Sequence, residues 1–386
     1  MNIPVIRILS PQLAFLGEID TYTSLSFTRV WQGVGEWEFT AFGPLNPAVL
    51  TEGNYIMLDS DGHRCGIIRS VEQQDSASGL TVTVRGQTLN GLASQRCTIP
   101  LEDPENGGYD LVPPAGSPVD QEGKSDVPAE SILKTYAKRH LAEPLDDKRK
   151  IPLLTVAPGQ ARGMKTVWMS RYEQLDGVLQ LVGEYTDMGW EIYIDLAKQK
   201  LVFDVIPGTD RSTNQSGNSR VIFSLEFESV ENLSYAHDVT GLKNLGYAGG
   251  AGEGADRIVL KVTNEPEEPA GLERFETFID CGTLEVTETD TALSLEEEGK
   301  HKLQDYPRTE SLTATIAQGG SFLYGVHWDL GDLVTVVDRS MGVAQDTRIS
   351  QVTERYESGN IGLDVVFGEA PKHLNRIIRT IKTTVR

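Results

Sequence analysis

The chain has 386 residues, of which 39% are hydrophobic, and a formal net charge of −21 at pH 7. This length and apolar content indicate a globular protein of two or three domains and exclude a disordered chain. Its 56 acidic against 35 basic side chains repel phosphate and argue against specific nucleic-acid binding. No run approaches the ~18 apolar residues of a membrane span, so stable membrane insertion is not expected.

Cysteine usage indicates the compartment in which the chain folds. Cys65, Cys97 and Cys281 lie far apart and form no C-x-x-C pair. Such spacing fits neither a disulfide framework nor a zinc knuckle, and it suits a reducing cytoplasm. The first residues lack the basic and long apolar regions of a signal peptide. We therefore expect synthesis in a cytoplasm.

The first region, 1–98, has the pattern of a small β-barrel or sandwich. Apolar and polar residues alternate in 37–42, which is the period of a half-buried strand. The strands expected at 55–59 and 80–85 alternate too. Ser60-Asp61-Gly62 predicts a hairpin turn in which Gly62 takes a positive φ.

The second region, 99–232, is predicted to be an α+β lateral domain. A loop rich in Pro and Gly precedes a helix near 128–141, which Asp126 would cap and in which Pro128 would lie in the first turn. A helix at 171–188 is predicted from Ser170 and Glu173, which have capping-box spacing.

Strands follow the second helix. The apolar runs 190–194 and 201–205 predict a β-hairpin, and 221–225 predicts a further strand.

The third region, 233–386, is predicted to hold a second β-barrel with an acidic insertion near 262–310. That insertion has 14 acidic and 4 basic residues, a net of −10. A helix is expected over 291–305, where charged pairs recur at i,i+4 spacing. Residues 372–386 hold five basic residues and no acidic one. This tail is either a frayed terminus or a docking segment for an acidic neighbour.

Two stretches near opposite ends of the chain resemble one another. The matched pairs, in order, are 53–59 with 331–338, 67–72 with 348–353, and 79–86 with 362–368. The spacings differ by a few residues in turns, where insertions are tolerated. The chain is thus predicted to carry one β-module twice, at 53–86 and 331–368, which favours assembly over catalysis.

A glycine-rich stretch gives the strongest false signal of nucleotide binding. Gly250, Gly252 and Ala255 satisfy the G-x-G-x-x-A pattern. That site needs a helix directly after the glycines, whereas the β-branched run 257–263 predicts a strand. Glu253 would also place a negative charge in the phosphate cradle. The stretch is therefore interpreted as a structural loop.

No residue pattern argues for catalysis, a cofactor or a metal. His63 and Cys65 have no second pair at ligand spacing, and 59–62 begins like a calcium loop but lacks its later ligands. We therefore predict no catalytic, cofactor-binding or metal-binding residues and no enzymatic activity.

Several segments in order resemble a siphovirus and prophage tail-protein family. They are Tyr22–Trp31, Gly35–Phe39, Gly208–Ser212, Val221–Ser224, Lys243–Tyr247, Gly252–Arg257 and Trp328–Val334. Family members are similar to tail-tip or baseplate hub proteins. The resemblance implies a mainly β, α+β fold with two similar tube-type β-barrels flanking α+β insertions.

The resemblance also implies an assembly. Three chains with two barrels each would give six quasi-equivalent positions, so that a homotrimer caps a hexameric tail tube and leaves a channel through which DNA passes. The implied partners are other tail proteins: the distal tail protein, the tape measure, and receptor-binding or tip proteins. The implied location is the virion tail, after synthesis in the host bacterial cytoplasm.

Two other functions remain open at this point. One is a tail-associated peptidoglycan hydrolase whose acid and base come from the carboxylates of 262–310. The other is a receptor- or carbohydrate-binding adhesin that uses aromatic side chains such as Trp328 and Tyr324.

Overall fold

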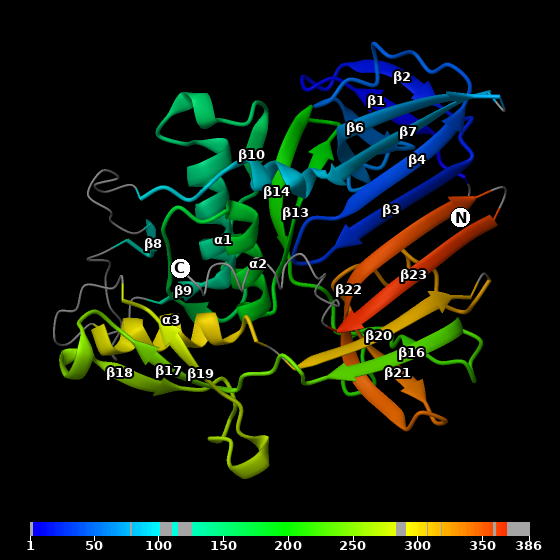
Figure 1. Ribbon diagram of the computed structural model, residues 1–386. Helices are drawn as coiled ribbons and strands as arrows, with labels where there is room; N and C mark the ends of the chain where they lie inside the picture. The colour runs from blue at the N-terminus through cyan, green and yellow to red at the C-terminus, as the bar shows by residue number, and fades with distance from the viewer. Residues whose placement is uncertain are drawn as a thin grey trace. The chain divides into compact units, whose positions relative to one another are not determined.

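The computed structural model describes most of the chain (Figure 1). The described residues are 3–77, 79–100, 110–114, 126–282, 291–306, 308–317, 319–357 and 360–368. The predicted basic tail at 372–386 lies outside them. Within these ranges no helix is long and apolar enough to cross a membrane.

The chain divides into two compact units. Unit 1 contains Met1–Leu233 and Thr313–Phe367, and unit 2 contains Ser234–Leu312 and the residues from Gly368 onward. The module 331–368 therefore belongs to unit 1 up to Phe367, whereas the acidic insertion 262–310 falls within the range of unit 2. The boundaries 1–98, 99–232 and 233–386 stay a prediction.

Thirteen of the described strands form one large sheet. They are β1 (Ile6–Leu9), β2 (Phe15–Ile19), β3 (Ser24–Val30), β4 (Glu36–Phe42), β5 (Tyr55–Leu58), β6 (Cys65–Ser76), β7 (Gly79–Thr88), β15 (Ile222–Phe223), β16 (Val230–Asp238), β20 (Thr309–Ile316), β21 (Leu333–Asp338), β22 (Val343–Glu357) and β23 (Asn360–Gly368). The main path runs β16-β20-β23-β22-β3-β4-β7-β6-β5-β1-β2, and β21 pairs with both β15 and β22.

The predicted repeat is confirmed as two equivalent three-stranded meanders, β5-β6-β7 and β21-β22-β23. Both begin at a glycine in the left-handed region, with φ 91° at Gly53 and 88° at Gly331. Each glycine amide donates to an isoleucine carbonyl in the second strand, at 2.9 Å to Ile68 and 2.8 Å to Ile349. The two modules thus begin with the same backbone conformation and the same hydrogen bond.

A β-bulge interrupts each meander at the matched position. The register shifts between Ile68 and Ser70 in the first module and between Ile349 and Gln351 in the second. Just before the bulge, Ile68 lies opposite Gly86 in the first module and Ile349 lies opposite Phe367 in the second. The structural match for Gly86 is therefore Phe367, one residue before the Gly368 that the sequence pairing suggested.

The two modules are not separated in space: they join edge to edge. β3 pairs antiparallel with β22 over seven residue pairs, from Gln351↔Val30 to Glu357↔Ser24. The adjacent strands are visible at the centre of the sheet in Figure 1. The pairings among described strands close neither module into a barrel, so two separate barrels stay a prediction, while the mainly β character is confirmed.

The insertion between the modules is α+β. Its elements are η1 (Leu89–Gln95), β8 (Asp110–Val112), β9 (Val127–Pro128), α1 (Ala129–Ala137), the π-helical turn η2 (Lys138–Ala142), η3 (Asp147–Arg149), β10 (Leu154–Val156), β11 (Lys165–Thr166), β12 (Trp168–Ser170), α2 (Leu175–Thr186), β13 (Gly189–Asp195) and β14 (Lys200–Ile206). The hairpin of β13 and β14 is as predicted. Of the strand expected at 221–225, only β15 forms.

The second helix begins later than predicted. α2 begins at Leu175, and no side chain caps it. Ser170 is the last residue of β12, and its hydroxyl donates to the Glu173 carboxylate at 2.6 Å. The Glu173 amide donates instead to Thr98 Oγ1 at 3.1 Å. A distant threonine has thus replaced Ser170 as acceptor, so the capping box does not form.

The first helix also begins without its predicted cap. Pro128 is the N-cap residue of α1, and no side chain caps the helix. The amides of Ala129 and Glu130 donate to the carbonyls of Met164 and Arg162 at 2.9 and 3.2 Å. Backbone carbonyls of another segment therefore accept the first helix amides, which the Asp126 side chain was expected to cap.

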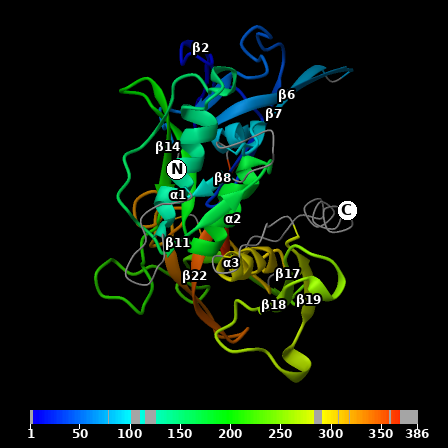
Figure 2. The same ribbon diagram turned by 90° about the vertical axis from the view of Figure 1, so that its left-hand side faces the viewer.

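Unit 2 contains a three-stranded sheet and a helix. The sheet has the order β18 (Val259–Val262), β17 (Leu245–Gly249), β19 (Glu276–Asp280), with 3-10 turns η4 (Gly254–Asp256) and η5 (Gly271–Glu273). The helix α3 (Thr291–Leu303) packs on these strands, as Figure 2 shows. Its predicted i,i+4 ion pairs form, for instance Lys300 to Glu296 at 2.6 Å. A strand, not a helix, follows the glycine-rich loop after η4, as predicted.

Candidate functional site at the junction of the two modules

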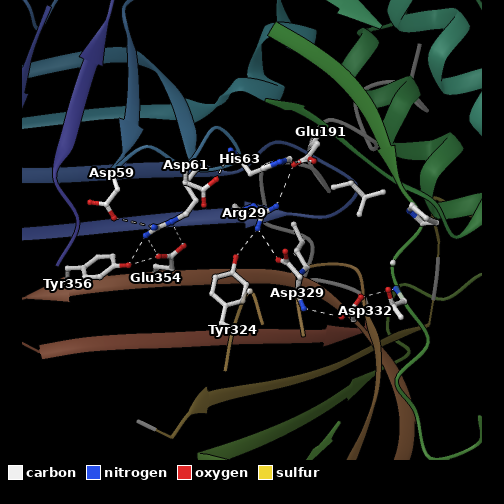
Figure 3. Close-up of a pocket in the computed structure, with 17 residues that line it drawn as sticks. Arg29, Asp59, Asp61, His63, Glu191, Tyr324, Asp329, Asp332, Glu354 and Tyr356 are labelled. Carbon is white, nitrogen blue, oxygen red and sulfur yellow. Dashed lines mark hydrogen bonds and ion pairs between the residues drawn. The ribbon is translucent and has the colours of Figure 1, made fainter. Parts of the chain in front are cut away.

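A polar cavity of about 690 Å³ lies where the two modules and the α+β insertion meet, all within unit 1 (Figure 3). The first module contributes β3 and the turn after β5. The second module contributes β22 and the segment before β21, and the insertion contributes Glu191 of β13. Two lining residues that contact one another, Arg29 and Asp329, lie 300 positions apart in the sequence.

Arg29 of β3 occupies the centre of the junction, with its side chain only 12% exposed. Its Nη1 donates to the Tyr324 hydroxyl at 2.9 Å and to Asp329 Oδ1 at 3.0 Å, and its Nη2 lies 3.5 Å from Glu191. Burial disfavours the charge, but these partners outweigh it and raise the pKa of Arg29 well above its usual value. The arginine is a permanent cation that joins three parts of unit 1.

A second arginine joins the modules on the other side of the cavity. Arg64 Nε donates to Glu354 Oε1 at 3.0 Å, and its Nη2 donates to the Tyr356 hydroxyl at 2.8 Å. The Glu354 side chain is 2% exposed. Burial, and then the Glu354 charge, raises the pKa of Tyr356. Buried charges are tolerated when they are paired in this way.

The turn after β5 contacts the insertion. His63 Nδ1 lies 2.9 Å from Glu191 Oε1, and its ring stacks on Tyr193 with centroids 4.5 Å apart. The hydrogen bond with Glu191 raises the pKa of His63. His63 therefore positions the turn and does not act with Cys65, whose thiol is buried with a raised pKa.

The turn itself differs from the prediction in one detail. The positive φ, 54°, belongs to Asp59, whereas Gly62 is not in the left-handed region. Gly62 is required for space: a Cβ there would come within 2.0 Å of the Ile194 carbonyl oxygen. That close approach lets the Ile194 amide donate to the Gly62 carbonyl at 3.0 Å.

Asp332 ties the end of the insertion to the second module. Its carboxylate accepts from the Thr209 amide at 2.8 Å, from Arg211 Nε at 2.7 Å and from the Asp329 amide at 3.0 Å. Two segments that resemble the tail-protein family in sequence, 208–212 and 328–334, therefore meet here.

The chemistry of the cavity is that of a structural junction. Arg29, Arg64, Glu191, Glu354 and Asp332 all have charged or hydrogen-bonding partners within the protein. In the described part of the chain no three His, Cys, Asp or Glu side chains are grouped to hold a metal ion. The half-exposed carboxylates at the rim, Asp59 and Asp329, leave the opening acidic.

Of the two aromatic candidates for ligand binding, Trp328 is buried and Tyr324 is half-buried in the wall of the cavity. Trp328 is 1% exposed and packs edge-on against Phe223, with centroids 5.4 Å apart. Tyr324 contacts both Trp328 and Arg29. Trp328 is therefore a buried aromatic residue.

Sequence reasoning missed Arg29, Arg64 and Glu354. A signal exists for Glu354, because it lies between Val352 and Tyr356 on the face of β22 that alternation predicts to be buried. A charge at such a position indicates a buried partner, but the identity of that partner depends on tertiary contacts.

The fold is shared with tail proteins, two of them described as prophage proteins. The tail protein of Neisseria meningitidis MC58 matches with a TM-score of 0.53 and 13% identity over 95% of this chain and 97% of that one. The 43 kDa tail protein of prophage MuSo2 from Shewanella oneidensis also matches with 0.53 and 13%, over 94% and 97%. Prophage tail protein gp18 of Listeria monocytogenes EGD-e matches with 0.50 and 11%, over 99% of both chains.

The family follows from the sequence itself. The family model described as siphovirus ReqiPepy6 Gp37-like protein matches residues 5–369, so the chain belongs to this family. No curated protein matches. The family predicted from the ordered motifs is confirmed.

Proposed function

We propose that the protein is a structural component of a phage tail tip, the baseplate hub. Three chains form a ring that caps the hexameric tail tube, connects it to the host-facing tip and leaves a channel through which DNA passes. The observation that carries this proposal is the duplicated module within one continuous sheet. Two matched modules per chain give a trimer six similar positions, which fit a six-fold neighbour.

The site supports a structural role for the junction and no catalysis. Its buried charges are paired within the protein, so they fix the angle between the modules and the insertion. The formal net charge of −21 suits a channel that DNA must pass without binding. The proposed location is the virion tail, with the distal tail protein, the tape measure and tip proteins as neighbours.

Mass measurement in solution together with particle imaging tests this proposal. We expect a species of three chains and rings with three-fold symmetry that show six similar lobes. A chain that stays monomeric at high concentration, alone and with the tail-tube protein, overturns the ring.

The two alternatives are tested on the same preparation. A zymogram on bacterial cell walls is expected to show no clearing, and clearing would favour the hydrolase. Glycan binding that persists in Trp328→Phe but is lost in Trp328→Ala would favour the adhesin. The 1% exposure of Trp328 argues against direct glycan contact.

A further inference from the structure

The repeat extends beyond the three strands that the sequence comparison found. In the first module the strand order is β3-β4-β7-β6-β5, and in the second it is β16-β20-β23-β22-β21. β16 therefore corresponds to β3. Their sequences agree with this match, since Ser24-Leu25-Ser26-Phe27 in β3 has Asn232-Leu233-Ser234-Tyr235 as its counterpart in β16.

The contact between the two modules is directional. The outer edge of β3, the first strand of module one, pairs with β22, the fourth strand of module two. By the same correspondence, the outer edge of β16 is equivalent to that of β3, and the edge of β6 is equivalent to the edge of β22 that β3 pairs with. Joining those two edges would repeat the β3–β22 contact between different copies of the chain.

Among the described strands, neither of these edges has a partner. β5 pairs with β6 only up to Ile67, and no described strand pairs with that edge over Arg69–Asp75. β16 has β20 as its one neighbour among the described strands, which leaves the opposite edge open over 231–236. Open edges present unpaired amides and carbonyls to any strand of matching length.

Side-chain burial shows what each open edge lacks. Val352 of β22 is 1% exposed under β3, whereas its counterpart Val71 in β6 is only half-buried. Phe27 of β3 is fully buried, whereas its counterpart Tyr235 in β16 is 38% exposed. Val71 and Tyr235 are apolar or aromatic like their counterparts, but no described neighbouring strand covers them as β3 and β22 cover each other.

We propose that β16 of one copy adds to the open edge of β6 in the next copy, antiparallel and in the register of β3–β22. This inference rests on the proposed function, and it specifies the surface by which one hub chain binds the next. Thr28 lies opposite Thr353 in the template, so Ala236 lies opposite Glu72 of the next copy.

The register places no like charges directly opposite one another. Glu72 meets Ala236, Gln73 meets Tyr235, and Asp75 meets Leu233, each pair being transferred from the β3–β22 register. Like charges directly opposite one another would destabilise the contact. The contact is heterologous, so it closes into a ring if the rotation fits.

Disulfide formation between copies tests the register. Chains carrying only Glu72→Cys are mixed with chains carrying only Ala236→Cys and oxidised. We expect a reductant-sensitive species of two chains on a gel. The double variant is expected to give covalent trimers. The unsubstituted chain, with its three native cysteines, gives the background.

Two controls make the result specific. Thr28→Cys with Thr353→Cys in one chain reproduces the template, where the two hydroxyl oxygens lie 3.0 Å apart, and should form a bond within the chain. Gln73→Cys replaces Glu72→Cys in the mixture as the mismatched control. Since side chains alternate between faces, it points away from Ala236 and should cross-link several-fold less.

The outcomes separate this inference from the proposed function. Preferential cross-linking of Glu72→Cys with Ala236→Cys supports the edge contact. If the mass shows trimers and the template control forms its disulfide, but Glu72→Cys and Ala236→Cys do not cross-link, the edge contact is overturned. The trimeric ring then still stands. Monomers at every concentration without any cross-link between copies overturn both.

Discussion

The two modules share their main backbone features but have different neighbours in the sheet. Gly53 and Gly331, the two bulges and the hydrogen bonds beside them coincide. The edges differ, because β22 pairs with β3 whereas no described strand pairs with the matching edge of β6 over Arg69–Asp75. Glu354 on the covered edge is buried and pairs with Arg64 of the first module, whereas its counterpart Gln73 on the open edge is exposed. The duplicated strands thus keep the same geometry, and the neighbouring strand determines which of their side chains are buried and paired.

The largest expected difference in stability is between alanine variants of Glu354 and of its counterpart Gln73. Glu354→Ala leaves Arg64 buried without its carboxylate, and such a loss costs about 3–5 kcal/mol of unfolding free energy. Gln73→Ala changes an exposed side chain and should stay within ~0.5 kcal/mol. Urea unfolding followed by tryptophan fluorescence measures both, since all five tryptophans lie in unit 1.

Glu354→Gln is the matched control for that comparison. It keeps the shape of the side chain and one acceptor oxygen but removes the charge. The loss of unfolding free energy should therefore fall between those of Glu354→Ala and Gln73→Ala. Equal destabilisation by Glu354→Ala and Gln73→Ala in the monomer would show that the covered edge does not depend on the ion pair.

The next effect compares the two glycines that begin the meanders. A Cβ on Gly53 would meet nothing within 4 Å, whereas one on Gly331 would lie 2.4 Å from Trp31 Nε1. Gly53→Ala should cost about 1–2 kcal/mol from its left-handed backbone alone. Gly331→Ala adds overpacking of about 1–3 kcal/mol. The same urea experiment measures the difference, and equal costs would contradict the contact with Trp31.

The smallest effect concerns the pH dependence of the turn in the first module. Glu191 raises the folded-state pKa of His63 above its unfolded value near 6.5. The stability from this pair is therefore fully present below pH 6.5 and is lost as the pH rises through the folded pKa. Because His63 is 48% exposed, the contribution should stay below ~1 kcal/mol.

NMR titration of the His63 ring checks this effect directly. The wild-type ring should titrate above 6.5, and Glu191→Gln should return it toward that value. The matched variant Asp329→Asn leaves Glu191 in place and should preserve the raised pKa. A His63 ring that titrates at the same pH in all three proteins would contradict the geometry.

Local patterns predicted the repeat and the elements of the fold, and long-range contacts decided the rest. Alternation and turn residues located both meanders, because those signals depend on near neighbours in sequence. The helix start at Ser170 was wrong because Thr98, 75 residues away, accepts the amide of Glu173. The Arg64–Glu354 pair spans 290 residues, so no spacing rule could have predicted it.

The β3–β22 contact also has a mechanical consequence. β3 and β22 lie antiparallel over seven residue pairs, so a pull along the strand axis loads their hydrogen bonds together in shear. A pull across the strands would break the same bonds one after another, as a zipper opens. The join between the modules should therefore resist tension along the strands far better than peeling, and a loaded assembly benefits when its strands lie along the line of force.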